Sequence, residues 1–200
     1  MEEMLRSHDV PNWYLDSCKK IKYMFPKAHA VAYLIAAIRL MWFKLYHPLE
    51  FYATYFTVRG DDIDYEAAVG GIKVAQRRMK EVAARLKEER TAKDEDVYSS
   101  LQIVCELLAR GYEFLPISIE KSEAKRYVVE NGKIRLPFSA LKGVGENAAN
   151  ALYEACKDGA NFLSQDELQQ KSGISSAVLE TMRAVGALAD LPESAQITLF

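Results

Sequence analysis

The strongest chemical signal in this sequence lies between Leu141 and Gly145, where two glycines flank one aliphatic residue. Glycine permits a tight turn and lets a phosphate approach the backbone closely, because it carries no side chain. N–H groups at the start of a following helix would point at such an anion. Lys142 adds a charge-assisted contact, and Val144 is expected to plug the core between two helices. Lys142, Gly143, Val144 and Gly145 are therefore the candidate DNA-binding residues.

The surrounding stretch, Ser139–Ala149, resembles a helix-hairpin-helix motif, with an apolar anchor before the glycines and a small-residue helix after them. Contacts of this kind hold the nucleic-acid backbone and carry no base sequence. The alternative is a glycine turn between two packed helices. A weaker copy follows at Ser172-Gly173-Ile174, with Ser175 where the second glycine would be, and we expect it to pack more than it binds.

A second signal is the final segment, Gln196-Ile197-Thr198-Leu199-Phe200, which combines an amide, two aliphatic anchors and a terminal aromatic. Apolar anchors on a free peptide can fill a preformed pocket, while the amide sets orientation through directional hydrogen bonds. The segment is typical of a docking peptide. The alternative is that these residues fold back onto their own core, as apolar chain ends often do.

Size and charge limit the possibilities. With 200 residues, half of them hydrophobic, the chain can form one medium domain or two small ones. A net charge of -2 creates no global field for nucleic acid, so DNA contacts must rest on local patches or backbone donors. Cys18, Cys105 and Cys156 lack the spacing of a disulfide framework or zinc site, and we expect buried thiols in a reducing cytoplasm.

No secretory signal is visible at the start, and the most apolar run, Ala30–Leu45, is interrupted by Arg39 and Lys44. It falls short of the ~20 apolar residues of a membrane span. We expect a buried helix there and no membrane partner.

Periodicity and breakers predict a mainly α fold. The Asn131-Gly132 pair is a strong hairpin signal between β-rich runs. The predicted helices lie at about 11–26, Ala28–Tyr46, from Pro48, Tyr65–Arg90 with a kink at Gly70-Gly71, 94–111, Glu146–Lys157, Ser164–Lys171 and Ser175–Val185. The first three are expected to form a compact bundle. We divide the chain into a helical part (1–113), a short β segment (114–138), tandem hairpins (139–191) and a flexible tail (192–200).

The stretch from Ser17 to Ala30, continuing through Ala32-Tyr33 to the Tyr46-His47-Pro48 break, resembles the fingers region of bacterial PolC-type DNA polymerase III alpha subunits. The resemblance implies a C-terminal fragment with the remaining fingers helices, a tandem helix-hairpin-helix domain that holds duplex DNA, and a terminal peptide that binds the sliding clamp. The clamp-binding residues would be Gln196, Ile197, Leu199 and Phe200.

The same resemblance places Lys27 and His29 close to the incoming nucleotide. A cation and an imidazole at a helix N-terminus would complement triphosphate oxygens. The alternative is a structural histidine and an exposed lysine. The family keeps its magnesium-binding aspartates in a palm domain upstream, so we expect no catalytic and no metal residue here. Asp61, Asp62 and Asp64 are better explained as turn and cap residues.

We therefore expect part of a replicative DNA polymerase, inactive alone, whose parent uses magnesium and deoxynucleoside triphosphates. Its partners would be duplex DNA and the sliding clamp, which together raise processivity through local concentration. A free-standing helix-hairpin-helix adaptor without a catalytic role is the competing hypothesis, and a purely structural helical protein comes third.

Overall fold

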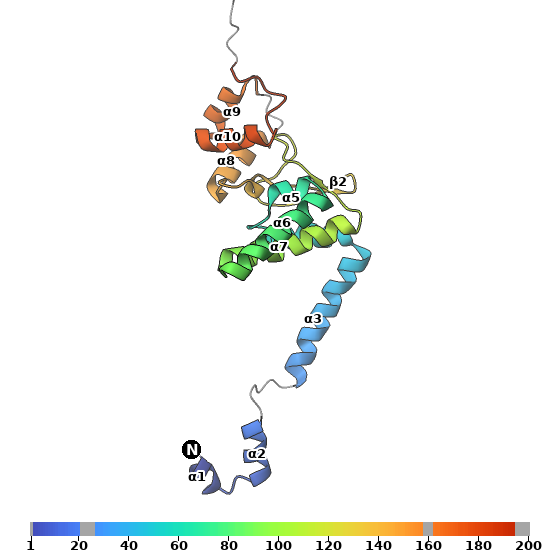
Figure 1. Cartoon of the computed structure of the whole chain (residues 1–200), viewed down its shortest axis with the longest axis vertical. Coiled ribbons are helices and arrows are strands. Elements are labelled where there is room, and N and C mark those ends of the chain that lie inside the picture. The colour runs from blue at the N-terminus through green and yellow to red at the C-terminus, as the bar shows by residue number, and fades with distance from the viewer. Residues whose placement is uncertain (1, 21–26, 158–161, 195–200) are drawn as a thin grey trace, which may run out of the picture. The chain divides into compact units, whose positions relative to one another are not determined.

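The computed structural model describes residues 2–20, 27–157 and 162–194 (Figure 1). These residues form ten α-helices, one 3-10 helix and three short strands, so the predicted mainly α fold is confirmed. The chain divides into two compact units, Met1–Trp42 and Phe43–Phe200.

The first unit contains helices α1 (Glu2–Arg6), α2 (Asn12–Lys20) and most of α3 (Lys27–Tyr46). The carboxylate of Glu2 joins α1 to α2, because it pairs with Arg6 at 2.9 Å and with Lys19 at 2.8 Å. Only Leu15 is buried among the described residues of α1 and α2. Cys18 is exposed, so its prediction as a buried thiol is wrong.

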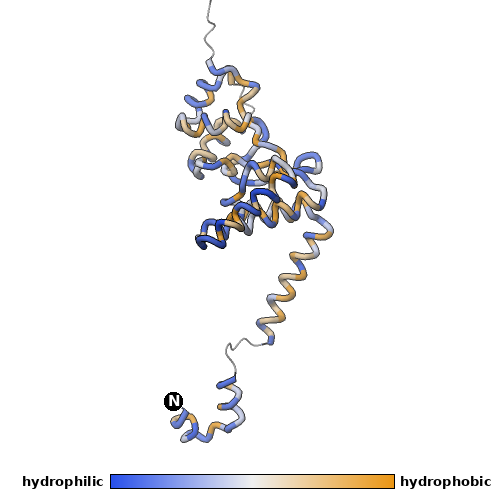
Figure 2. The backbone as a smooth tube through the Cα atoms, in the orientation of Figure 1, coloured by the Kyte–Doolittle hydropathy of each residue, from blue (hydrophilic) through white to orange (hydrophobic). Residues whose placement is uncertain are grey.

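Helix α3 begins and ends where the sequence predicts, but none of its residues is buried. The expectation of a buried helix is therefore wrong, because within the first unit no described residue covers the apolar side chains of α3. Figure 2 shows hydrophobic residues distributed along the whole helix. By length and composition α3 could cross a membrane, a property shared by core helices of soluble proteins.

The second unit begins with α4 (Pro48–Arg59), α5 (Tyr65–Val69), α6 (Ile72–Glu88) and α7 (Ala92–Ala109). The predicted continuous helix from Tyr65 to Arg90 is two helices, because Gly71 adopts a φ of 81°, which a right-handed helix does not accommodate. Asp64 caps α5 by accepting from the Ala67 N–H at 3.0 Å, as expected of a cap residue. Helices α6 and α7 pack against each other along their lengths (Figure 1).

A small sheet follows, formed by β1 (Phe114–Leu115), β2 (Val128–Glu130) and β3 (Lys133–Arg135) in the order β1-β3-β2. Asn131 and Gly132, with φ of 51° and 77°, make the predicted turn between β2 and the antiparallel β3. Strand β1 pairs with β3 in parallel. Phe56 of α4 packs beneath the sheet, with ring centroids 5.4 Å from Phe114 and 5.6 Å from Tyr127.

Beyond the sheet the chain enters the two hairpins, composed of the 3-10 helix η1 (Phe138–Ala140) and helices α8 (Glu146–Cys156), α9 (Gln165–Ser172) and α10 (Ser176–Ala184). Two backbone bonds fix η1 to the preceding loop, from Phe138 to Glu123 at 2.9 Å and from Ser139 to Ala124 at 3.0 Å. Helix α8 contacts both η1 and α9, and α9 contacts α10 (Figure 1). The three predicted helices are confirmed to within a residue at either end.

Candidate nucleic-acid interface

The first hairpin is a tight turn with its two apolar residues inside. The N–H of Val144 donates to the carbonyl of Leu141 at 3.1 Å, and Gly143 between them has a φ of 86°. A turn with positive φ at its third residue favours glycine. Leu141 and Val144 are only 3% and 6% exposed, so Val144 fills the core as predicted.

The other residues of this turn face outward. Lys142, Gly143 and Gly145 are exposed, and among the described residues the ammonium of Lys142 has no hydrogen-bond or ion-pair partner. A β-carbon added at Gly143 or Gly145 would meet no atom within 4 Å. The backbone here is therefore open to close approach by a ligand.

The start of α8 supplies the hydrogen-bond donors. Gly145 is its N-cap, and no side chain caps the helix. The first N–H groups of any helix lack intrahelical acceptors. In the described part of the chain, the N–H groups of Gly145, Glu146 and Asn147 donate to no backbone carbonyl outside the helix. These donors lie at the positive end of the α8 dipole, where an anion is favoured.

One acidic group lies beside these donors. Glu146 occupies the first turn of α8, and its carboxylate is 3.5 Å from the ammonium of Lys125. Because both side chains are largely exposed, the pair is weak and screened by salt. Lys125 nevertheless offsets the negative charge at the helix start.

The second hairpin repeats the scaffold without the open donors. Gly173 has a φ of 69° and Ile174 is 6% exposed, matching Gly143 and Val144 in backbone and burial. Ser175, however, caps α10 by accepting from the N–H of Val178 at 3.4 Å. The amide of Gln169 also donates to the carbonyl of Ile174 at 3.3 Å. The start of α10 is therefore capped by a side chain, whereas the start of α8 is not. That the second hairpin packs more than it binds stays a prediction.

The remaining predicted site residues lie elsewhere. Lys27 and His29 are exposed on the first turn of α3, in the first unit, and the His29 ring makes an edge contact with Tyr33 at 4.6 Å between centroids. The clamp-binding residues Gln196, Ile197, Leu199 and Phe200 lie outside the described residues. Within the described ranges no three His, Cys, Asp or Glu side chains are grouped to hold a metal.

Cys156 lies on the inner side of α8, where burial raises the pKa of its thiol to about 11. The thiol is therefore neutral at pH 7 and acts as an apolar side chain. Cys105 is half-buried, and burial raises its pKa too.

Sequence reasoning missed two features of the second unit. A polar cluster joins Glu106 to Lys44 at 2.8 Å and to the Tyr52 hydroxyl at 3.0 Å. Burial opposes ionisation of Glu106, but these hydrogen bonds outweigh it and lower its pKa. No local pattern signals partners so far apart in the chain. The second feature is a groove between α6 and α7. The signal available in the sequence was Tyr98, which follows a run of basic residues.

Comparisons with known proteins agree with the hairpin geometry. The helix-hairpin-helix motif family matches residues 111–196, which include both hairpins. Over all 200 residues the chain is 42% identical to DNA polymerase III PolC-type of Staphylococcus aureus strains MW2, USA300 and NCTC 8325. The whole chain is therefore similar to one segment of PolC-type DNA polymerase III. It spans only 14% of the length of those relatives.

Proposed function

We propose that the chain is the part of a bacterial replicative DNA polymerase that holds duplex DNA by its backbone through the first hairpin. The observation that carries the proposal is the uncapped start of α8 behind Gly143, with its donors exposed and Lys142 beside them. Identity spread over all 200 residues favours a polymerase segment over a free-standing adaptor, which would share only the hairpins. The parent would work in the cytoplasm.

The proposed contact is electrostatic and independent of base sequence, because backbone N–H groups and one lysine recognise phosphate oxygens only. Each phosphate that the protein neutralises on duplex DNA contributes a slope of about -0.9 to log K against log salt. Binding should therefore weaken steeply with salt and vary little among duplexes of different sequence.

The test uses a Lys142→Glu, Gly143→Pro double variant with a mixed-sequence duplex at several salt concentrations. Proline cannot adopt the positive φ of Gly143, so the turn would change shape. We expect at least a tenfold loss of affinity. Lys142→Glu alone keeps Gly143 and the turn, so a loss of affinity in this variant cannot be due to misfolding of the turn. Lys133→Glu on β3 reverses one charge away from the hairpin and is the control for the change in net charge. Affinity equal to that of the wild type in the double variant would refute the hairpin as the contact.

We also propose that Lys27 and His29 help to bind the triphosphate of the incoming nucleotide in the parent enzyme. Both residues are exposed on the first turn of α3, where the helix dipole adds to the attraction for an anion. The aspartates that hold magnesium would lie outside this chain. His29→Ala in the complete polymerase should weaken the apparent nucleotide affinity with an unchanged melting temperature, and an unchanged affinity would refute the contact.

The last five residues are proposed to tether the polymerase to the sliding clamp, on the basis of their anchor pattern. A calorimetric titration of this chain with a sliding clamp tests the proposal. Deletion of residues 196–200 should abolish the heat of binding without lowering the melting temperature. A large loss of stability would show instead that the segment packs on its own core.

A further inference from the structure

Helix α6 carries a row of cations on the face that points away from the core. Lys73, Arg77, Lys80 and Lys87 are all exposed. At 3.6 residues per turn they fall within an arc of about 80°, and at 1.5 Å per residue the row is about 21 Å long. The buried residues of this helix, Ala75 and Val82, lie on the opposite side. We call the four cations the basic stripe.

The stripe does not serve the fold. In the described part of the chain Lys73, Lys80 and Lys87 have no ion-pair partner, and Arg77 approaches only Glu81, at 3.8 Å. The two other arginines of α6 have structural roles, because Arg78 pairs with Asp64 and Arg85 with Asp94, each at 2.8 Å. The hydrogen bond to Asp64 raises the pKa of Arg78.

Charge is strongly concentrated on this helix. Its sequence holds six cations and two glutamates, whereas the whole chain has a net charge of -2. Four like charges on one face repel one another and cost stability unless a partner of opposite charge binds there. The stripe therefore has the electrostatics of a binding surface for a polyanion.

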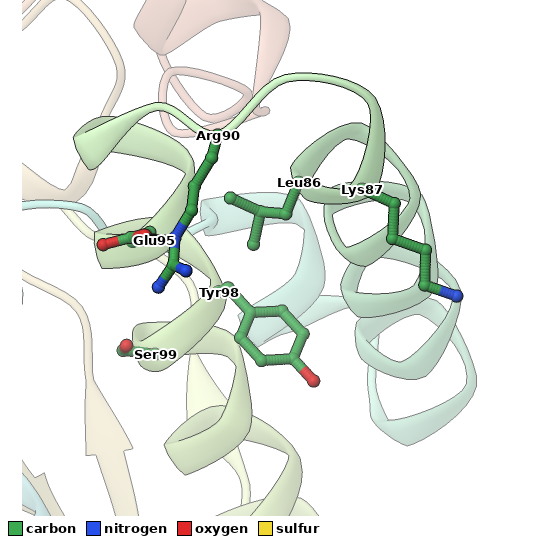
Figure 3. Close-up of a pocket in the computed structure, with 6 residues that line it drawn as sticks. All are labelled: Leu86, Lys87, Arg90, Glu95, Tyr98 and Ser99. Carbon is green, nitrogen blue, oxygen red and sulfur yellow. Dashed lines mark hydrogen bonds and ion pairs between the residues drawn. The ribbon is translucent and has the colours of Figure 1, made fainter.

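A groove lies where the stripe ends, between the last turn of α6 and the first turns of α7. It has a volume of about 420 Å³ and is lined by Leu86, Lys87, Arg90, Glu95, Tyr98 and Ser99. Figure 3 shows Leu86 beside the half-buried ring of Tyr98, with Arg90 reaching toward Glu95 on one side and Lys87 extending away on the other. Lys87 belongs to both the groove and the stripe. Figure 2 shows this end of the α6–α7 pair as strongly hydrophilic.

We propose that the basic stripe and the groove bind single-stranded DNA, with phosphates along the stripe and one base against Tyr98. An aromatic ring flanked by cations is the arrangement that binds single strands without sequence preference. In a duplex the faces of the bases are covered by their neighbours, so only an unpaired base can reach the ring. This surface is separate from the hairpins and does not depend on their function.

The experiment measures binding of the full chain to a fluorescent oligothymidylate of about 20 nucleotides across a salt series. Lys73→Gln, Arg77→Gln, Lys80→Gln and Lys87→Gln are combined in one stripe variant. Because these residues face away from the core, the variant should fold, which circular dichroism checks. We expect the variant to lose at least tenfold in affinity. The slope of log K against log salt should fall in magnitude by about 3, because each of the four lost phosphate contacts contributes about 0.7 on a single strand.

The matched control removes four cations from elsewhere in the second unit, namely Lys121→Gln, Arg126→Gln, Lys133→Gln and Lys171→Gln. It has the same net charge as the stripe variant and should keep at least half of the wild-type affinity. If the stripe variant loses no more affinity than this control, the proposal is overturned.

Tyr98 distinguishes single strands from duplexes. Tyr98→Ala should weaken oligothymidylate binding about fivefold or more, with little effect on a blunt duplex, whereas Tyr98→Phe should bind as the wild type does. The assignment to single strands would be overturned by two results together. Tyr98→Ala would bind oligothymidylate as tightly as the wild type, and the stripe variant would lose the same affinity for oligothymidylate as for the duplex. The hairpin proposal is tested with Lys142→Glu on duplex DNA, and the stripe proposal is tested on oligothymidylate. Either proposal can therefore fail without the other.

Discussion

In the first hairpin Gly145 leaves the start of α8 without a side-chain cap, whereas in the second hairpin Ser175 caps α10. The backbone at the two positions is nearly identical, with φ and ψ of -72° and 167° at Gly145 and -71° and 157° at Ser175. The two helix starts therefore differ by one side chain. The first N–H groups of α8 are left without a side-chain acceptor, whereas Ser175 accepts a hydrogen bond from an N–H group of α10. Two copies of one scaffold can differ in binding through the N-cap residue alone.

The hairpins also differ in how firmly they are held. Gln169 donates to the Ser176 hydroxyl at 3.1 Å and to the carbonyl of Ile174, which joins the turn to α9. Gln165 donates to the carbonyl of Leu191 at 2.9 Å and accepts from Arg183 at 2.8 Å, closing the second hairpin. These bonds lie within the second hairpin, so under the proposed function its role would be to support the fold while the first hairpin contacts DNA.

Loss of the buried aliphatic side chain that both hairpins share should have the largest effect on the free energy of unfolding. Val144→Ala and Ile174→Ala each remove buried methyl groups between two helices, and each should cost about 2 kcal/mol or more of unfolding free energy. Urea denaturation measures the loss, with the exposed Val129→Ala as the control, which should change stability by less than about 0.5 kcal/mol. A large loss in one hairpin and none in the other would break the proposed equivalence of their cores.

Gly145→Ser converts the first N-cap into the residue of the second. The site has room for the side chain, since an added β-carbon meets no atom within 4 Å. The hydroxyl should occupy one donor of α8, so duplex affinity should fall about tenfold, or about 1.4 kcal/mol, while stability rises by a few tenths of a kcal/mol. Fluorescence anisotropy and thermal melts measure the two effects, and an unchanged affinity would count against the open donors as the contact.

Ser175→Ala removes the cap of α10 and should lower the unfolding free energy by about 1 kcal/mol. Duplex affinity should stay within twofold of the wild type, because the second hairpin is not expected to bind. Chemical denaturation and anisotropy are again the measurements. A tenfold loss of affinity in a folded Ser175→Ala variant would assign part of the DNA contact to the second hairpin.

The smallest effect is on pH dependence. A hydrogen bond from Lys171 and another from the Leu163 N–H lower the pKa of Glu167 in α9. A carboxylate with a depressed folded pKa stabilises the fold above its unfolded pKa, about 4.3, and this contribution is lost as pH falls through the folded value. The wild type should therefore lose more stability than Glu167→Gln between pH 6 and pH 3 in thermal melts. Parallel curves for the two proteins would show that Glu167 makes no such contribution.

Local chemistry made much of the fold predictable. The Asn131-Gly132 turn, the helix starts at Pro48 and Asp64, and the buried Leu141 and Val144 all follow from the conformations and polarity of single residues. The first hairpin was recognisable because its glycines are needed for backbone reasons. The substitution at Ser175 was also visible, and the structure adds the hydrogen bond that explains it.

Features that depend on distant partners were not predictable. Burial of α3 could not be judged from its apolar composition, because burial depends on which surfaces surround a helix. The parallel pairing of β1 with β3 and the groove between α6 and α7 arise from tertiary packing, which leaves no periodic pattern. At the split between α5 and α6 the sequence predicts only a kink, because a glycine can adopt either sign of φ and its identity alone does not fix the value of 81° at Gly71.

The most direct measurement of the central claim is an amide NMR titration of the chain with a short duplex. We predict that the resonances of Gly145, Glu146 and Asn147 shift strongly, and that those of Ser176, Ala177 and Val178 in the second hairpin do not. Shifts confined to Ser176–Val178, or none at the start of α8 under conditions where the duplex binds, would contradict the account.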